Sequence, residues 1–76
     1  MNVNKLIRMA NQIAANFEYG ADAKKAASGV ADHLRRFWTP DMRAQIVDYR
    51  GRGGTELSEI AALAVADLAA ETNHAA

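Results

Sequence analysis

The chain has 76 residues, no Cys and a formal net charge of zero, with nine basic and nine acidic side chains. This length suits a single domain with a small apolar core, and the lack of Cys excludes disulfides and thiolate metal sites within it. No apolar run approaches the roughly 20 residues that cross a bilayer, and the N-terminus lacks the apolar segment of a signal peptide. We therefore expect a cytoplasmic domain that does not bind membranes.

The charges are unevenly spread along the chain. Residues 1–38 carry six basic and three acidic side chains, whereas residues 39–76 carry three basic and six acidic ones. Such polarity favours docking by electrostatic complementarity, whereas general nucleic-acid binding needs a basic excess. Ala, at 17 of 76 residues, favours helix but adds little buried area. These features favour a protein partner, with self-association as an open alternative, and no nucleic acid.

The first predicted helix spans residues 3–17, where apolar side chains recur at the spacing of one helix face. Asn2 or Asn4 suits its N-cap, and Gly20 suits the position after its end. Ile7 and Met9 flank the inward stripe. The inward residues are Val3, Leu6, Ala10, Ile13, Ala14 and Phe17.

The second predicted helix spans residues 23–38 and is capped by Asp22, with Gly29 on its polar side. Its inward residues are Ala23, Ala26, Ala27, Val30, Leu34, Phe37 and Trp38. Thr39 and Pro40 end this helix and begin the next, because the residue before Pro avoids the α region, Thr is a good N-cap and Pro suits the first helical position.

The third predicted helix spans residues 40–49, with Val47 pointing away from its inward side chains Met42, Ile46 and Tyr49. Residues 50–54 hold three glycines and read as a flexible linker, since they lack the spacing of a phosphate-binding loop. The fourth predicted helix spans residues 58–70, and residues 72–76 form a predicted disordered tail. Leu63 lies off its inward stripe, which consists of Leu57, Ile60, Ala61, Ala64, Val65 and Leu68. The sequence predicts an all-α domain, a small bundle of four helices.

We find no constellation typical of an enzyme. The two histidines, His33 and His74, are too few for a metal site, and they lie in different segments. Thr39, Thr55 and Ser58 occupy capping positions, with no base in helical register. The sequence therefore assigns no catalytic, cofactor-binding or metal-binding residue.

The segment from His33 to Arg43 holds the only Trp, the only Pro and three of the six Arg. Arg35 and Arg36 project to opposite flanks of the second helix, and Arg43 follows in the third. In one interpretation the Arg stems only cover the apolar edge, with their charged ends in water. In the other they form a protein-binding patch, because Trp, Tyr and Arg dominate interface hot spots.

A helix-turn-helix DNA-binding regulator is the alternative function. Its turn would carry Pro rather than Gly, and the recognition helix would offer Asp41 and Asp48 to phosphate, which charge disfavours.

Several apolar side chains lie off the inward stripes and cannot all be buried by so small a bundle: Ile7, Met9, Tyr19, Val47 and Leu63. Exposed together, they would form a large patch of the kind that marks an interaction surface. The candidate partner-binding residues are His33, Arg35, Arg36, Trp38, Arg43, Ile7, Met9, Val47 and Leu63.

The segment from His33 to Arg43 resembles the delta subunit family of NAD-dependent formate dehydrogenases. The segment from Lys5 to Ile13 is similar to the start of that family, and Gly53-Gly54 with Leu57-Ser58 is similar to a later loop. The resemblance covers roughly Asn4 to Leu68. Glu59 stands where the family is expected to carry Pro, and Glu also suits a first helical turn.

The resemblance implies a non-catalytic accessory subunit of a cytoplasmic molybdenum or tungsten formate dehydrogenase, one that binds and stabilises the large catalytic subunit or assists its assembly and cofactor insertion. It implies that the partner subunits hold bis-molybdopterin guanine dinucleotide, iron–sulfur clusters and FMN, and that this chain holds no cofactor. It also implies a structural or docking role for Arg35, Arg36, Phe37, Trp38, Pro40 and Arg43.

Overall fold

The computed structural model describes residues 2–18 and 22–74, of which 72–74 by their backbone alone, and these segments form helices and no strand. The helices are α1 (Val3–Phe17), α2 (Ala23–Phe37), α3 (Pro40–Gly51) and α4 (Glu59–His74). The all-α class and the expected helix order are confirmed.

The helix bounds differ from the prediction at four places, the first being that α4 begins at Glu59 rather than Ser58. Helix α2 ends at Phe37 rather than Trp38, α3 continues past Tyr49 to Gly51, and α4 continues past Ala70 to His74. Helix α4 therefore runs through the first part of the predicted tail. The disorder predicted for residues 72–76 stays a prediction. Tyr19, predicted to be an exposed apolar residue, and Gly20, predicted to follow the end of the first helix, lie outside the described residues.

Each helix begins beside a polar side chain that accepts a hydrogen bond from a free backbone N–H of its first turn. Asn2 Oδ1 accepts from the Asn4 N–H and Asp22 Oδ1 from the Lys25 N–H, both at 2.8 Å. Thr39 Oγ1 accepts from the Met42 N–H at 3.2 Å, as the sequence predicts for the corner before Pro40. Before α4, the Ser58 hydroxyl accepts from the Ala61 N–H at 3.3 Å.

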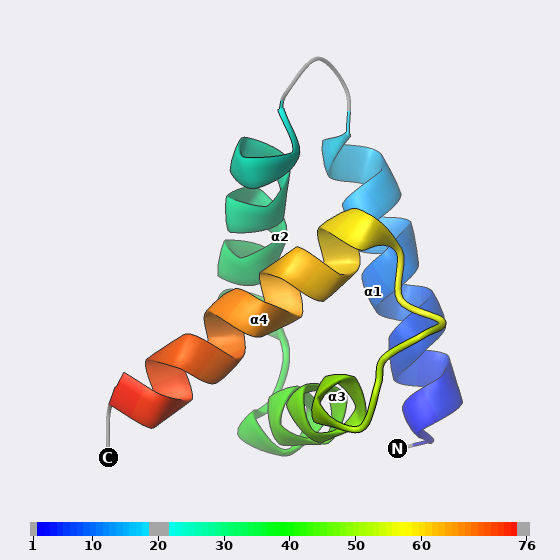
Figure 1. The fold of residues 1–76 in the computed structure, drawn as a ribbon, viewed down its shortest axis with the longest axis vertical. Helices are drawn as coiled ribbons and strands as arrows, with labels where there is room; N and C mark the ends of the chain where they lie inside the picture. The colour runs from blue at the N-terminus through cyan, green and yellow to red at the C-terminus, as the bar shows by residue number, and fades with distance from the viewer. Residues whose placement is uncertain (1, 19–21, 75–76) are drawn as a thin grey trace.

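The helices pack as a hairpin crossed by a third helix and closed at one end by a fourth (Figure 1). Helices α1 and α2 run antiparallel side by side, and α4 crosses in front of both. Helix α3 lies at the end of the hairpin where α2 finishes, and it packs against α1 and α4. The four helices thus do not lie parallel as in an up-and-down bundle.

The core lies where α4 crosses the hairpin. The largest fully buried side chains are Leu6, Val30, Leu34, Ile46 and Val65. Seven buried alanines on α1, α2 and α4 surround them, and these small side chains let the helices approach closely. All the predicted inward residues near and in α4, from Leu57 to Leu68, are buried.

Two adjacent aromatic residues at the end of α2, Phe37 and Trp38, differ in burial. Trp38 leaves the helix in an extended conformation (φ −89°, ψ 145°) and its side chain is 6% exposed. Phe37, predicted to face inward, is 71% exposed. Because the chain turns at Trp38, only that side chain enters the core. Ala23, at the start of α2, is also exposed against prediction, and Phe17, at the end of α1, is 37% exposed.

Helix α1 buries a wider face than its periodicity predicts. Ile7, expected at an exposed edge, is 4% exposed because α1 packs against all three other helices. Met9 and Val47 are half-buried and pack against the core, so they too are less exposed than expected. Leu63 is exposed on α4, as predicted.

The glycine-rich segment after α3 is held in place rather than being a free linker. Gly53 and Gly54 have positive φ values of 135° and 60°, which glycine adopts without strain. Asn11 of α1 then clamps the following residues, because its Nδ2 donates to the Glu56 carbonyl at 2.9 Å and its Oδ1 accepts from the Ser58 N–H at 2.8 Å. The hydroxyl of Tyr49 accepts from the Glu56 N–H at 3.1 Å.

Candidate functional site

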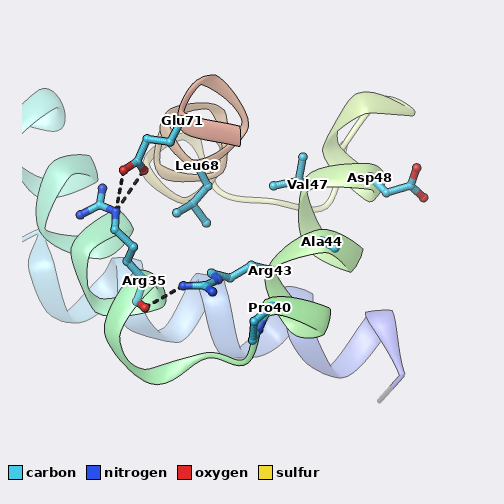
Figure 2. Close-up of a pocket in the computed structure, with 8 residues that line it drawn as sticks. All are labelled: Arg35, Pro40, Arg43, Ala44, Val47, Asp48, Leu68 and Glu71. Atoms are coloured by element: carbon cyan, nitrogen blue, oxygen red, sulfur yellow. Dashed lines mark hydrogen bonds and ion pairs between the residues drawn. The ribbon is translucent and has the colours of Figure 1, made fainter. Parts of the chain in front are cut away.

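The corner between α2 and α3 is braced by two arginines of the His33–Arg43 segment. Arg43 Nη1 donates to the backbone carbonyl of Arg35 at 2.7 Å and so satisfies an acceptor at the end of α2. Arg35 Nε lies 2.9 Å from a carboxylate oxygen of Glu71 on α4. Figure 2 shows both contacts, which join three helices at one point.

Arg36 plays no part in this bracing. Its Nε lies 3.1 Å from Asp32, one turn earlier on the same helix, and Asp32 also contacts Arg35 at 3.2 Å. Both arginines therefore contact Asp32, but only Arg35 also reaches another helix, through Glu71 of α4. Arg35 and Arg43 hold the fold together, whereas the charged end of Arg36 stays on the surface.

A groove of about 610 Å³ lies between α3 and α4, next to this corner. Figure 2 shows Val47 of α3 and Leu68 of α4 along it, with Arg35, Arg43 and Glu71 at one end and Asp48 at the other. We call it the α3–α4 groove; its lining residues are Arg35, Pro40, Arg43, Ala44, Val47, Asp48, Leu68 and Glu71. Its arginines already have partners within the chain, and Asp48 pairs with Arg52 at 3.0 Å. The groove therefore offers mainly apolar surface to a ligand.

A second surface lies along the seam of α1 and α2. The His33 ring is 4.7 Å from the Phe37 ring and 6.5 Å from the Phe17 ring, measured between ring centroids, in tilted and edge-on arrangements. Phe17 comes from α1 and the other two from α2, and we call these three residues the aromatic row. Phe17 and Phe37 are two of the three large apolar side chains that are exposed in the described part of the chain.

The outer side of α1 has a shallow hollow of about 620 Å³. We call it the α1 hollow; it is lined by Lys5, Arg8, Met9, Gln12 and Ile13. Met9, Ile13 and Phe17 recur every four residues, so they form one ridge that leads from the hollow to the aromatic row. Neither Lys5 nor Arg8 has an ion pair or side-chain hydrogen bond among the described residues.

The structure thus distributes the predicted partner-binding residues over different places. Arg35, Arg43 and Val47 line the α3–α4 groove. His33 belongs to the aromatic row, with Arg36 one turn further along α2, and Met9 lines the α1 hollow. Trp38 and Ile7 are buried, so neither side chain offers a surface to a partner. Leu63 stands on α4 apart from these surfaces.

Sequence reasoning missed four residues. Phe17 and Phe37 were assigned to the core, although each is the last residue of its helix, where neighbouring helices give less cover. Lys5 and Arg8 received no role, because they lie on α1 opposite its predicted inward stripe. Their spacing with Met9 and Ile13, at i, i+3 and i+4, was the available signal for a mixed apolar and basic surface.

The described residues contain no group of three or more His, Cys, Asp or Glu that could hold a metal ion. None of the helices in that part of the chain is long and apolar enough to cross a membrane.

The arginines of α3 and its C-cap weaken the DNA-binding alternative. Arg43 donates to the Arg35 carbonyl, Arg50 Nε donates to the Ala62 carbonyl at 2.9 Å, and Arg52 pairs with Asp48. A recognition helix needs such cations to neutralise phosphates, and here each is engaged within the chain.

The comparisons with known proteins give one match. The family model described as NADH-dependent formate dehydrogenase delta subunit FdsD matches residues 5–65. The match runs from the first turn of α1 into α4, and it includes the α1 hollow, the aromatic row and the corner at Pro40. No curated protein and no solved structure is significantly similar to the chain.

Proposed function

Because this chain belongs to the family of NADH-dependent formate dehydrogenase delta subunits, we propose that it is a non-catalytic accessory subunit of such a complex. In this proposal it binds the large catalytic subunit in the cytoplasm and stabilises it, or assists its assembly and the insertion of its cofactor. The observation that carries the proposal is the family match over residues 5–65.

Two features of the molecule support a binding role. Large aromatic side chains are exposed at the ends of α1 and α2, and exposed apolar surface next to Arg is typical of interaction sites. Two of the three arginines of the His33–Arg43 segment, Arg35 and Arg43, brace the corner. The segment then serves as a rigid support that fixes α2 relative to α3 and α4.

We assign the redox centres to the partner subunits. Iron–sulfur clusters are held by Cys thiolates, and these 76 residues contain no Cys. The clusters would then belong to other chains, and we assign the molybdenum or tungsten cofactor and FMN to those chains as well. The contribution of this chain would be the surface that it covers on the large subunit.

Co-purification tests the binding part of the proposal. An affinity-tagged copy of the full chain is produced together with the other subunits of the complex, and the eluate is examined by mass spectrometry. We expect the large catalytic subunit to be retained in a fixed ratio to the tagged chain. If no large redox subunit is retained at low salt, the accessory-subunit proposal is wrong.

A second experiment tests what the binding achieves. The other subunits are produced with and without this chain, and the metal content, formate oxidation and thermal unfolding of the large subunit are compared. Stabilisation predicts a lower unfolding temperature without the chain at unchanged metal content. An assembly role predicts a lower metal content as well. If the large subunit is the same in all three measurements, the proposed function is overturned.

A further inference from the structure

The aromatic row and the α1 hollow form one continuous strip across α1 and α2. Met9 and Ile13 form the floor of the hollow and Phe17 continues their ridge, which meets His33 and Phe37 in the aromatic row. Phe37, at 71% exposure, is the most exposed large apolar side chain in the described part of the chain. We call this strip, with the cations beside it, the basic aromatic face.

The cations beside this strip lack carboxylate partners from other helices. Lys5 and Arg8 have no side-chain partner among the described residues, and Arg36 has only Asp32, a neighbour on its own helix. The aromatic row and the α1 hollow both lie in residues 1–38, the half of the chain with six basic and three acidic side chains. The strip therefore combines exposed apolar surface with two cations, Lys5 and Arg8, that no described side chain pairs, and a third, Arg36, that is paired only on its own helix.

We propose that the basic aromatic face binds an acidic amphipathic segment of the large catalytic subunit of the complex. The apolar side chains of that segment cover Phe37 and the Met9–Phe17 ridge, while its carboxylates meet Lys5, Arg8 and Arg36. Aromatic rings and Arg make the strongest single contributions at interfaces, and opposite charges around them guide association. This inference rests on the proposed function, since it names the surface and the partner chemistry for it.

The α3–α4 groove is less suited to such a partner. Its arginines are satisfied by Glu71 and by the Arg35 carbonyl, and its Asp48 pairs with Arg52. A partner that docked there would have to compete with contacts that already exist. The basic aromatic face presents charges that a partner can pair without breaking any contact between helices.

A second copy of this chain fits the face poorly. In the described part of its acidic half, residues 39–71, one large apolar side chain is exposed, Leu63, with Glu59 and Asp67 one turn before and after it on α4. One leucine is too small to cover the ridge and the aromatic row. Such a contact would also join different surfaces of two copies, and contacts of that kind extend into open chains unless they close into a ring.

The experiment uses two pairs of variants of the full tagged chain, co-produced with the other subunits. Lys5→Glu with Arg8→Glu reverses the charge of the face, and Lys24→Glu with Lys25→Glu reverses the same number of charges on exposed positions of α2 outside it. Both substitutions place Glu in or near a first helical turn, where it suits the helix dipole. Phe37→Ser is compared with Leu63→Ser, two exposed positions.

We expect the Lys5/Arg8 variant to retain roughly tenfold less large subunit than wild type at low salt, since electrostatic steering of this kind is worth about 10-fold or more, and the difference should shrink as salt is raised and screens the charges. Phe37→Ser should also reduce retention by roughly tenfold. The Lys24/Lys25 and Leu63→Ser controls should retain it like wild type. Circular dichroism of each purified variant confirms that it is folded.

The outcomes separate this inference from the proposed function. If wild type retains the large subunit and the two face variants, shown to be folded, retain it equally well, this inference is overturned and the proposed function stands. If wild type retains no subunit, both are overturned. If sedimentation shows instead that wild type forms dimers that Phe37→Ser dissociates, the occupant is a second copy and the inference is overturned.

Discussion

The ring of Phe17 occupies the space that a side chain at Gly29 would need. A Cβ built on Gly29 would lie 2.7 Å from Cδ1 of Phe17, a separation that real Cβ atoms do not show. Gly inside a helix costs about 1 kcal/mol relative to Ala. Helix α2 therefore has Gly29, its residue of lowest helix propensity, at the point where the Phe17 ring of α1 packs against it, next to His33.

This contact predicts that Gly29→Ala has different effects with and without the ring. In the wild-type chain the new methyl group must displace Phe17, so we expect no gain in the free energy of unfolding, or a small loss. In a Phe17→Ala background the same change should stabilise the domain by about 1 kcal/mol. Urea unfolding of the wild type, the two single variants and the double variant measures the coupling energy between residues 17 and 29. An equal gain in unfolding free energy from Gly29→Ala in both backgrounds would contradict the contact.

The adjacent residues Phe37 and Trp38 should respond oppositely to truncation. Trp38→Ala removes a buried side chain from the core and should cost about 3–5 kcal/mol. A domain of this size has only a few kcal/mol of stability, so this variant should be largely unfolded at room temperature. Phe37→Ala should change the unfolding free energy by about 0.5 kcal/mol or less. Thermal unfolding by circular dichroism checks both, and a folded Trp38→Ala variant would argue against a buried Trp38.

Asn11 should be the most important polar side chain on α1. Its amide both donates to the Glu56 carbonyl and accepts from the Ser58 N–H, so Asn11→Ala leaves two backbone groups without their partner. We expect a loss of about 1–3 kcal/mol. The adjacent exposed Gln12→Ala is the control and should be nearly neutral. Hydrogen exchange at the Ser58 amide should accelerate in the Asn11 variant, and unchanged exchange there would rule out the clamp.

The three arginines of the corner should differ in their effect on stability. Arg43→Ala removes a charge-assisted hydrogen bond to the end of α2 and should cost about 1–2 kcal/mol. Arg36→Ala removes only an exposed pair with Asp32 and should cost less than about 0.5 kcal/mol. Arg35→Ala should fall between them, because it loses an exposed contact to α4. Chemical unfolding ranks the variants, and an effect of Arg36→Ala equal to that of Arg43→Ala would contradict the assignment.

The sequence predicted the helices because local signals define where each one begins. Asp22 and Thr39 were recognisable as N-caps, and Pro40 marked the first position of α3. The helix ends were less predictable. Helix α4 continues to His74 because no glycine or proline stops it after Leu68, and Ala and Glu in that stretch favour helix.

The candidate site was predicted only in part, for reasons that lie in the packing. Periodicity predicts which face of a helix a residue lies on. It does not predict whether another helix packs over that residue, and this decides whether the side chain is buried. Ile7 is buried because α1 contacts three helices, and Phe37 is exposed because the chain turns at Trp38. Helical periodicity therefore predicted an exposed position for Ile7, which is buried, and an inward position for Phe37, which is exposed.

The amino-acid sequence by itself determined the helical class, the N-caps, the corner at Pro40 and the polarity of charge, because each depends on a few neighbouring residues. The family could be recognised for the same reason, from short motifs that lie within single segments. Only the tertiary structure decided which charges remain available. Arg35 is satisfied by Glu71 of α4 and Arg43 by the Arg35 carbonyl of α2, whereas Lys5 and Arg8 find no side-chain partner within the described residues. Contacts between distant segments make that difference, and they exist only once the helices have packed.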